Sequence, residues 1–282
     1  MSTSQIWLIT GTSSGFGEAF VKDLLARGDK VIATARNTSR IAHLKQLGAA
    51  TIQLDVTASQ KELENTAKEA INIYGKIDVL VNNAGYSHFG TFEDSRPEDW
   101  QKQFDTNVFG AINTTRAFLP HLRGNKSGTI VFIGSAAALS GMPLLSLYCA
   151  SKFALTGAAE SLSQEVAPFG IRTLIVQPGF FRTAFLSEMN PAYIDTDIDD
   201  YKEIVSNTYG QFKSADGKQP GDPEKGANRV IDVVKGEGLA KGKGFPGTLM
   251  LGADVWSGAK QRVNSDLKLL EEWEKVSDGL DH

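Results

Sequence analysis

Short apolar runs alternate with longer amphipathic segments along most of the chain. Runs typical of buried parallel strands lie at residues 6–10, 30–34, 50–54, 78–82, 129–133, 172–177 and 248–251. Between them, apolar residues recur at helical spacing, first from Gly15 to about Gly28 and then over 59–74, 97–122, 148–168 and 222–234. Repeated strand–helix alternation predicts right-handed βαβ units, and therefore an α/β fold with a single doubly wound parallel sheet and helices on both faces.

The segment 183–220 breaks this alternation with acidic and polar stretches such as YIDTDIDDYKE. Long irregular segments in compact domains commonly cover a binding site. We therefore expect one domain over residues 1–282, with 183–220 as a mobile lid over the substrate. The alternative is a fixed pair of surface helices without a role in binding. The last amphipathic stretch, 255–276, carries two tryptophans and is expected to pack in the core or against another subunit.

The composition is that of an ordinary globular protein. The 282 residues carry a net charge of −4 and no basic run, which argues against nucleic acid as a partner. The single cysteine, Cys149, excludes an internal disulfide, and the 4 histidines have no zinc-site spacing. No apolar run approaches the ~20 residues of a membrane span, and the start MSTSQIWLIT has no signal-peptide pattern. We expect a cytoplasmic protein without a metal.

Three glycines separate the first strand from the first helix, in the stretch ITGTSSGFGEAF. They are Gly11, Gly15 and Gly17. A strand, a glycine-rich turn and a helix N-terminus together form an anion cradle, because free backbone N–H groups and the helix dipole both favour a phosphate. A P-loop is excluded, since no Lys-Ser or Lys-Thr pair follows the last glycine. The glycines by themselves leave open a tight turn without a ligand.

The residue after the second strand bears on the kind of dinucleotide. In a doubly wound sheet this point meets the adenosine ribose, where an acidic residue binds the 2′-hydroxyl of NAD and repels the 2′-phosphate of NADP. The chain places Arg36 there, in VIATARNTSR, and has no acidic residue between Val31 and Leu54. A guanidinium can bind the phosphate with two donors and stack on the adenine. The alternative is an ordinary surface arginine.

Two tyrosine–lysine pairs have the same four-residue spacing, which places both side chains on one face of a helix. Tyr148 and Lys152 follow the apolar run GTIVFIGS, which ends in Ser135, whereas Tyr209 and Lys213 lie in the irregular segment. A cation about 4 Å from a phenol favours the phenolate by roughly three pKa units, so such a pair can exchange a proton near neutral pH. A serine beside it can donate to the same substrate oxygen. The context favours the first pair as catalytic.

In combination, these motifs resemble those of the short-chain dehydrogenase/reductase family, in its compact single-domain branch with a Rossmann fold. The resemblance runs from about Ile6 to Thr183 and is looser beyond. It is carried by T-G-x-x-x-G-x-G at residues 10–17, N-N-A-G at 82–85, Ser135 with the Tyr148 and Lys152 pair, and P-G at 178–179. The stretch VIATARN is loosely similar to 17β-hydroxysteroid and retinol dehydrogenases. The glycine spacing is then this family's own pyrophosphate turn.

The resemblance implies a role for each matching position. Tyr148 would be the acid/base, Lys152 would lower its pKa and hold the nicotinamide ribose, Ser135 would orient the substrate oxygen, and Asn107 would support a proton relay. The implied cofactor contacts are Tyr148 and Lys152 together with Gly11, Ser13, Ser14, Gly15, Phe16, Gly17, Arg36, Asp55, Val56, Asn83, Ala84, Gly85, Pro178, Gly179, Phe181 and Thr183. For Asn107 the alternative is a polar helix residue that bonds to backbone, and for Asp55 a helix cap.

One departure from the family bears on the cofactor. Many NADP-preferring members carry a basic residue where this chain has Ser14, so the 2′-phosphate would depend mainly on Arg36. NADP is expected, and NAD is the less favoured cofactor.

The resulting prediction is an NADP(H)-dependent oxidoreductase acting on a carbonyl or secondary alcohol. Substrate contacts are expected from Ser135 and Tyr148 and from apolar walls made by Met142, Phe180, Phe185 and Leu186, which suit a lipophilic ketone or aldehyde. The alternatives are a dinucleotide-sensing protein without turnover and an epimerase or dehydratase that uses the same Tyr/Lys pair. Family membership further implies a homodimer or homotetramer, with only a small-molecule substrate as ligand besides the cofactor.

Overall fold

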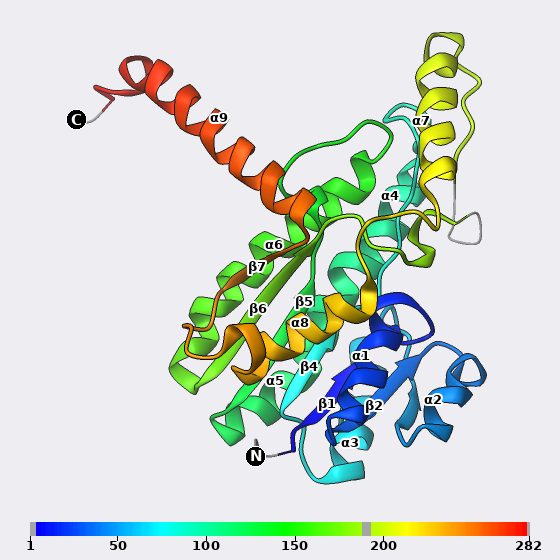
Figure 1. The fold of residues 1–282 in the computed structure, drawn as a ribbon, viewed down its shortest axis with the longest axis vertical. Helices are drawn as coiled ribbons and strands as arrows, with labels where there is room; N and C mark the ends of the chain where they lie inside the picture. The colour runs from blue at the N-terminus through cyan, green and yellow to red at the C-terminus, as the bar shows by residue number, and fades with distance from the viewer. Residues whose placement is uncertain (1–3, 188–192, 281–282) are drawn as a thin grey trace.

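The computed structural model describes residues 4–187 and 193–280. Within these residues, seven parallel strands form one sheet in the order β3-β2-β1-β4-β5-β6-β7 (Figure 1). The strands are β1 Ile6–Ile9, β2 Lys30–Ala35, β3 Ala50–Gln53, β4 Val79–Asn82, β5 Gly128–Ile133, β6 Ile171–Pro178 and β7 Thr248–Leu251. The doubly wound parallel sheet expected from the sequence is confirmed, and every strand end lies within one residue of its predicted position.

The strand order reverses at the β1–β4 pair. β1 pairs with β2 on one side and with β4 on the other, with Trp7 in register with Val79 and Leu8 with Leu80. The loops after β1 and β4 therefore diverge to opposite sides of the sheet from neighbouring strand ends. Such a switch point opens a crevice at the carboxyl ends of the strands, where doubly wound folds bind their ligands.

Helices cover both faces of the sheet (Figure 1). Because side chains alternate along a strand, Trp7 and Ile9 pack in one apolar cluster with α1 and α8, and Leu8 packs in the other with α3, α5 and α6. The bounds are α1 Gly15–Ala26, α2 Ala42–Gln46, α3 Gln60–Tyr74, α4 Pro97–Phe104, α5 Gly110–Asn125, α6 Ser146–Val166, α7 Lys202–Ala215, α8 Pro223–Lys235 and α9 Ala253–Ser277.

Three sequence predictions about helices need correction. The expected helix 97–122 is interrupted, because residues Asp105–Phe109 form a π-helical segment between α4 and α5. The segment 183–220 is not irregular throughout, since it contains α7; its residues 188–192 lie outside the described part. Of the two expectations for 255–276, packing in the core is wrong, because Val255 is the one buried residue in the described helix α9 and Trp256 is 60% exposed; packing against another subunit stays a prediction.

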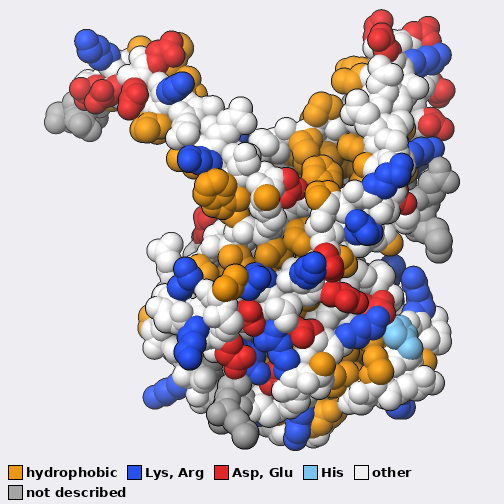
Figure 2. Space-filling model, in the orientation of Figure 1, with side chains coloured by type: hydrophobic (Ala, Val, Ile, Leu, Met, Phe, Trp, Pro, Cys, Tyr) orange, Lys and Arg blue, Asp and Glu red, His pale blue; other side chains and the backbone are white. Residues whose placement is uncertain are grey.

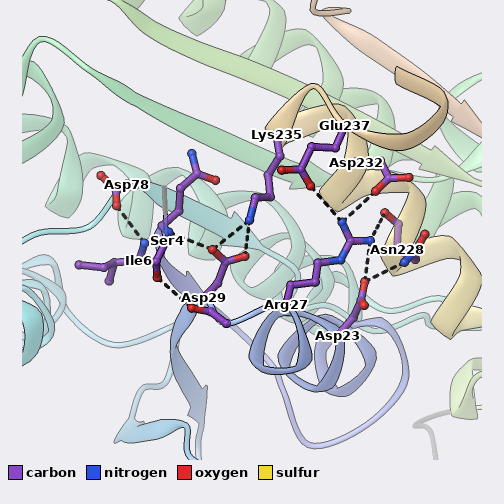
Figure 3. Close-up of polar contacts among 12 residues, drawn as sticks. Ser4, Ile6, Asp23, Arg27, Asp29, Asp78, Asn228, Asp232, Lys235 and Glu237 are labelled. Carbon is purple, nitrogen blue, oxygen red and sulfur yellow. Dashed lines mark hydrogen bonds and ion pairs between the residues drawn. The ribbon is translucent and has the colours of Figure 1, made fainter. Parts of the chain in front are cut away.

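A network of ion pairs joins α1 and α8 at the end of the sheet away from the crevice (Figure 3). The Arg27 guanidinium, at the C-terminus of α1, binds Asp232 at 2.8 Å and Asp23 at 3.2 Å. Lys235 Nζ binds the Asp29 carboxylate at 2.7 Å, and the two side chains are only 4% and 1% exposed. The fold thus buries the Lys235–Asp29 ion pair, whereas Arg27 stays partly exposed.

We expect Lys235→Met to lower the free energy of unfolding by about 3–5 kcal/mol, because it leaves the buried Asp29 carboxylate without its cation. Urea unfolding followed by circular dichroism measures this loss. Adding Asp29→Asn should restore more than half of it. The matched control, Lys202→Met, removes a pair with Asp199 whose side chains are 59% and 89% exposed, and should change stability by less than about 1 kcal/mol. Equal losses in Lys235→Met and Lys202→Met would contradict the claim that the buried Lys235–Asp29 pair stabilises the fold more than the exposed pair does.

Candidate active site

The structure brings Ser135, Tyr148 and Lys152 together at the carboxyl edge of the sheet. Ser135 lies two residues after β5, and the other two residues lie in the first turns of α6. The hydroxyl groups of Ser135 and Tyr148 are hydrogen-bonded to each other. Lys152 Nζ lies 5.6 Å from the centre of the Tyr148 ring. The second pair is elsewhere: Tyr209 donates to the carbonyl oxygens of Phe89 and Ile194, at 3.0 and 2.7 Å.

The Lys152 ammonium is buried, with the residue 6% exposed, and it donates to the carbonyl oxygen of Ile133 at 2.8 Å. Burial lowers the pKa of Lys152 from its ordinary 10.5 to about 8. Between about pH 8 and pH 10.5, Lys152 is therefore more fully protonated in the unfolded chain than in the folded chain. Burial of the charged Lys152 therefore opposes folding below about pH 8, and this cost is relieved as the pH rises toward 10.5.

Tyr148 keeps its proton in this environment. It is 7% exposed, and burial raises its pKa more than the hydrogen bond from Ser135 lowers it. The sequence predicted that Lys152 lowers the pKa of Tyr148, but in the folded chain the pKa of Tyr148 is raised. Desolvation dominates because the phenolate would lie in an apolar cluster with Leu145 and Leu186. A protonated phenol is set to donate rather than to accept a proton.

Asn107 lies in the π-helical segment and is 1% exposed. Its Nδ2 donates to the carbonyl oxygen of Tyr86 at 2.9 Å and to Ser151 Oγ at 3.2 Å, and its Oδ1 accepts the Tyr86 N–H at 3.1 Å. A Cβ built on Gly85 would lie 3.2 Å from Asn107 Oδ1 and 3.8 Å from Lys152 Nζ. The Asn107 amide therefore bonds to backbone, which was the alternative expected for this residue. Gly85 lies next to both this amide and Lys152 Nζ. Short π-helical segments within α-helices are frequent at functional sites.

The glycine turn between β1 and α1 has the shape of a phosphate cradle. Gly11 and Gly15 have φ of +69° and +58°, which side chains other than glycine rarely adopt, and a Cβ on Gly17 would lie 2.3 Å from the Gly11 oxygen. Ser14 is the N-cap of α1, and its side chain makes no cap hydrogen bond within the described chain. The α1 N-terminus thus presents backbone N–H groups between the partly buried Ser13 and Gly15. These residues fit a dinucleotide pyrophosphate.

Residues of the N-N-A-G motif hold this turn in place. Asn83 Nδ2 donates to the carbonyl oxygens of Thr10 and Gly11, each at 2.9 Å. The N–H groups of Asn83 and Ala84 both donate to Thr10 Oγ1 at 3.0 Å. A Cβ on Gly11 would lie 2.8 Å from the Ala84 Cα. Asn83 therefore positions the cradle, while Gly85 is exposed beside it.

The residues expected to meet the adenosine lie at the ends of β2 and β3. Arg36 follows β2 directly and is exposed. Asp55 Oδ1 accepts the N–H and the hydroxyl of Thr57, at 3.0 and 2.8 Å, in a local turn. The alternative of a helix cap is wrong for Asp55, because Ser59 caps α3. Val56 is buried against Gly110 of α5.

The turn after β6 is fixed by a residue that the sequence did not reveal. Pro178 ends β6, Gly179 donates to the Leu251 oxygen at 3.0 Å, and the Phe180 N–H donates to Asp254 Oδ2 at 2.7 Å. A Cβ on Gly179 would lie 2.2 Å from the Asp254 carboxylate. An aspartate near a helix start indicates only a cap, so its contact with this turn depends on the tertiary fold. Ser151, which bonds Asn107, was missed for the same reason.

The segment after this turn contacts both the glycine turn at α1 and the catalytic candidate Tyr148. The Phe181 ring packs on Phe16 of α1 with centroids 4.9 Å apart. Thr183 lies against Gly15, where an added Cβ would be 3.2 Å from its Cγ2. The Phe185 ring packs on Tyr148 with centroids 5.1 Å apart.

Apolar side chains surround the catalytic candidates. Leu186 is 2% exposed, and Met142 and Phe185 pack against the cluster that contains Tyr148. Phe180 is 45% exposed and is not part of this cluster. The described residues contain no group of His, Cys, Asp and Glu that could hold a metal. In the same part of the chain, every helix is too short or too polar to cross a membrane.

The fold and the residues at its carboxyl edge define a dinucleotide-binding oxidoreductase. A model of the short chain dehydrogenase family matches residues 5–194. The chain therefore belongs to the short chain dehydrogenase family.

Relatives support this membership. An uncharacterized oxidoreductase of Bacillus subtilis, YusZ, is 36% identical over 266 residues, which are 87% of this chain and 92% of that protein. A 3-ketodihydrosphingosine reductase of Bacteroides thetaiotaomicron is 38% identical over 200 residues, 71% of this chain and 72% of its own.

Solved structures have the same fold. A short-chain dehydrogenase from Streptomyces avermitilis matches with a TM-score of 0.87 and 38% identity, covering 99% of this chain and 100% of that one. ElxO with NADP bound matches with a TM-score of 0.72 and 25% identity, and the match covers 90% of this chain and 100% of that one.

Proposed function

We propose that this protein is an NADP(H)-dependent reductase that converts a lipophilic ketone or aldehyde into an alcohol. The observation that carries the proposal is the hydrogen-bonded Ser135–Tyr148 hydroxyl pair, with the Lys152 ammonium beside the Tyr148 ring. A substrate oxygen that accepts from both hydroxyls would be polarised and held at one point.

In this mechanism Tyr148 donates its proton to the carbonyl oxygen as the carbon accepts a hydride. The cofactor supplies that hydride when bound, and in its oxidised form carries a positive charge on the nicotinamide. Ser135 stabilises the charge that develops on the oxygen. Lys152 keeps an ammonium beside the phenol, and Asn107 holds the backbone of Tyr86, next to the Gly85 that faces the lysine. Because burial raises the pKa of Tyr148, the phenol is protonated in the resting site, which is the form that donates a proton to a carbonyl oxygen.

The preference for NADP rests on Arg36. An exposed guanidinium at the end of β2 is available to a 2′-phosphate, and a carboxylate that would repel the phosphate is missing from residues 31–54. Structural neighbours have been solved with NADP and with NAD, so they support a nicotinamide dinucleotide and leave the preference between the two to Arg36. NAD is the less favoured cofactor, since Ser14 adds no second charge.

The apolar cluster around Tyr148 supports a lipophilic substrate. It extends from Leu145 on α6 to Val205 on α7, so a long apolar group bound next to the hydroxyl pair would have hydrocarbon neighbours along its length. The similarity to a 3-ketodihydrosphingosine reductase favours the same class of ketone. A dinucleotide sensor or an epimerase remains the alternative, and neither would consume reduced cofactor stoichiometrically with a ketone.

A single assay tests the reaction class. Purified protein is mixed with NADPH and a panel of ketones from acetone to long-chain and steroidal ketones, and absorbance of the reduced nicotinamide is followed. We expect consumption of one NADPH per ketone, faster with bulky apolar ketones. Tight NADPH binding without any consumption across the panel would favour the sensor.

We propose further that residues 183–187 and 193–220 form a lid within a single domain. Phe185 covers Tyr148, so it must move when a substrate oxygen approaches the phenol. Tyr209 ties α7 to the loop after β4 through the Phe89 oxygen, and the Tyr193 hydroxyl donates to the Leu186 oxygen at 2.9 Å. A homodimer or homotetramer and a cytoplasmic location complete the proposal.

We expect Phe185→Ala and Leu186→Ala to raise KM for bulky ketones by at least about tenfold more than KM for small ones, because each removes apolar contact worth roughly 1.5–3 kcal/mol. NADPH affinity should stay nearly constant. Steady-state kinetics on paired small and bulky ketones measures this difference. Phe169→Ala serves as control, since Phe169 is 42% exposed at the opposite edge of the sheet, before β6. Uniform effects on both substrates, or amide exchange in 193–220 that does not slow with ligand, would disprove the lid.

A further inference from the structure

Helix α9 extends away from the rest of the molecule as a long arm (Figure 1). Its 25 residues span about 37 Å at the rise of an α-helix. Figure 2 shows apolar side chains exposed along this arm. The large ones are Trp256, Val263, Leu267, Leu269, Leu270, Trp273 and Val276, each 51–69% exposed. An arm this apolar is unusual for a surface that meets only water.

Some of these exposed side chains form a stripe. Trp256, Val263, Leu267 and Leu270 lie within about 60° of one another around the helix axis, and Trp273 extends the stripe on one side. Leu269 and Val276 lie about 100° or more from the first four. Near the base of the arm, the body of the protein contacts a different side of α9: Arg262, about 80–140° from the first four side chains, donates to the carbonyl oxygen of Leu139 at 2.8 Å. The stripe is therefore presented outward.

The charges of α9 divide along its length. Residues 253–265 hold Asp254, Lys260 and Arg262, a net charge of +1, whereas residues 266–277 hold Asp266, Lys268, Glu271, Glu272, Glu274 and Lys275, a net charge of −2. An antiparallel pair of such helices brings the net acidic half of one against the net basic half of the other. The charge pattern therefore favours the antiparallel orientation.

We infer that α9 packs antiparallel against the α9 of a second copy of this chain, with the stripes facing each other. In a pairing centred between Val263 and Leu267, Lys260 of each copy lies opposite Glu271 and Glu274 of the other. The five stripe side chains expose on the order of 600 Å², so the pair buries roughly 1,200 Å², the lower end of stable interfaces. The two-fold symmetry makes every contact occur twice.

A lipid surface is the other occupant that an apolar helix with tryptophans can meet. The acidic second half of α9 opposes it, because Glu271, Glu272 and Glu274 would be repelled by anionic headgroups. Pairing with a second copy instead neutralises these charges. The structure therefore favours the protein partner over the membrane.

The first test is the mass of the full-length protein by light scattering after size-exclusion chromatography. We expect an even-numbered oligomer for the natural chain, and half that mass for Val263→Glu and for Leu270→Glu at equal concentration. Leu239→Glu is the control: Leu239 is 68% exposed outside α9 and its variant should keep the natural mass. Circular dichroism and NADPH binding confirm folding. A monomeric natural chain, or an unchanged mass in both α9 variants, would overturn the inference.

Charge reversal tests the antiparallel orientation. Lys260→Glu should raise the dissociation constant of the α9 pairing at least about tenfold at low salt, and the variant Lys260→Glu with Glu271→Lys and Glu274→Lys should restore it to within about threefold. Sedimentation velocity over a dilution series measures both. No restoration in the triple variant would exclude the antiparallel pair. If the natural chain is monomeric and co-sediments with phosphatidylcholine–phosphatidylserine vesicles, the partner of α9 is a membrane and the proposed pairing is wrong.

Discussion

Replacing Tyr148 by Phe is expected to lower kcat by at least about 10³-fold while NADPH binds with its natural affinity. The variant keeps the ring that packs on Phe185 and loses only the hydroxyl that bonds Ser135. Because general acid catalysis contributes about 10²–10⁴-fold and the same hydroxyl also positions the substrate oxygen, the loss should lie at the upper end. Stopped-flow ketone reduction gives the rate, and fluorescence titration with NADPH gives the affinity.

The matched control is Tyr209→Phe, which removes a hydroxyl from the other tyrosine–lysine pair of the same spacing. Tyr209 donates to the Phe89 and Ile194 oxygens and so anchors α7, away from Ser135. We expect kcat within a few fold of the natural enzyme. A kcat for Tyr148→Phe that matches the natural enzyme, or a loss in Tyr209→Phe of equal depth, would mean that the assigned pair is not the catalytic one.

Arg36→Asp is expected to lower the ratio of kcat/KM for NADPH to that for NADH by at least about 100-fold. The change removes a charge-assisted contact worth about 1.5–3 kcal/mol and adds a carboxylate that repels the 2′-phosphate and accepts from the 2′-hydroxyl of NAD. Because Arg36 is exposed and follows β2 directly, we expect the fold to tolerate the change. Steady-state kinetics with both cofactors at one ketone concentration measures the ratio.

Arg116→Asp controls for the change in net charge, because Arg116 is exposed on α5 and bonds only Asn113 of its own helix among the described residues. Its cofactor ratio should not change. An unchanged ratio in Arg36→Asp would show that another residue reads the ribose.

The sheet was predictable because its signals are local. Each strand from β1 to β6 is an apolar run between turn residues, and a buried parallel strand needs no partner-specific pattern to be recognised. The glycine turn was also predictable, since positive φ at Gly11 and Gly15 and the close approach at Gly17 leave little choice of residue. The same holds for Tyr148 and Lys152, whose helical spacing places them on one face.

Features that depend on tertiary packing were not predictable. The π-helical segment at Asn107 leaves no mark in the hydrophobic period, and the contact of Asp254 with Gly179 joins residues 75 positions apart. The pKa of Tyr148 was expected to fall because Lys152 is near, yet burial raises it, and this burial comes from packing against residues distant in sequence such as Phe185 and Leu186. The apolar residues of α9 predicted packing in the core or against another subunit, because a sequence does not distinguish these two kinds of contact.

The central claim is that a hydride passes from the nicotinamide to a carbonyl carbon while Tyr148 supplies the proton. The most direct measurement uses NADPH that carries deuterium at both C4 positions, a bulky ketone that the enzyme reduces, and mass spectrometry of the alcohol. We predict one deuterium on the carbinol carbon of every product molecule, and no product above background with Tyr148→Phe. An alcohol without deuterium, or labelled product at the natural rate from Tyr148→Phe, would contradict the account.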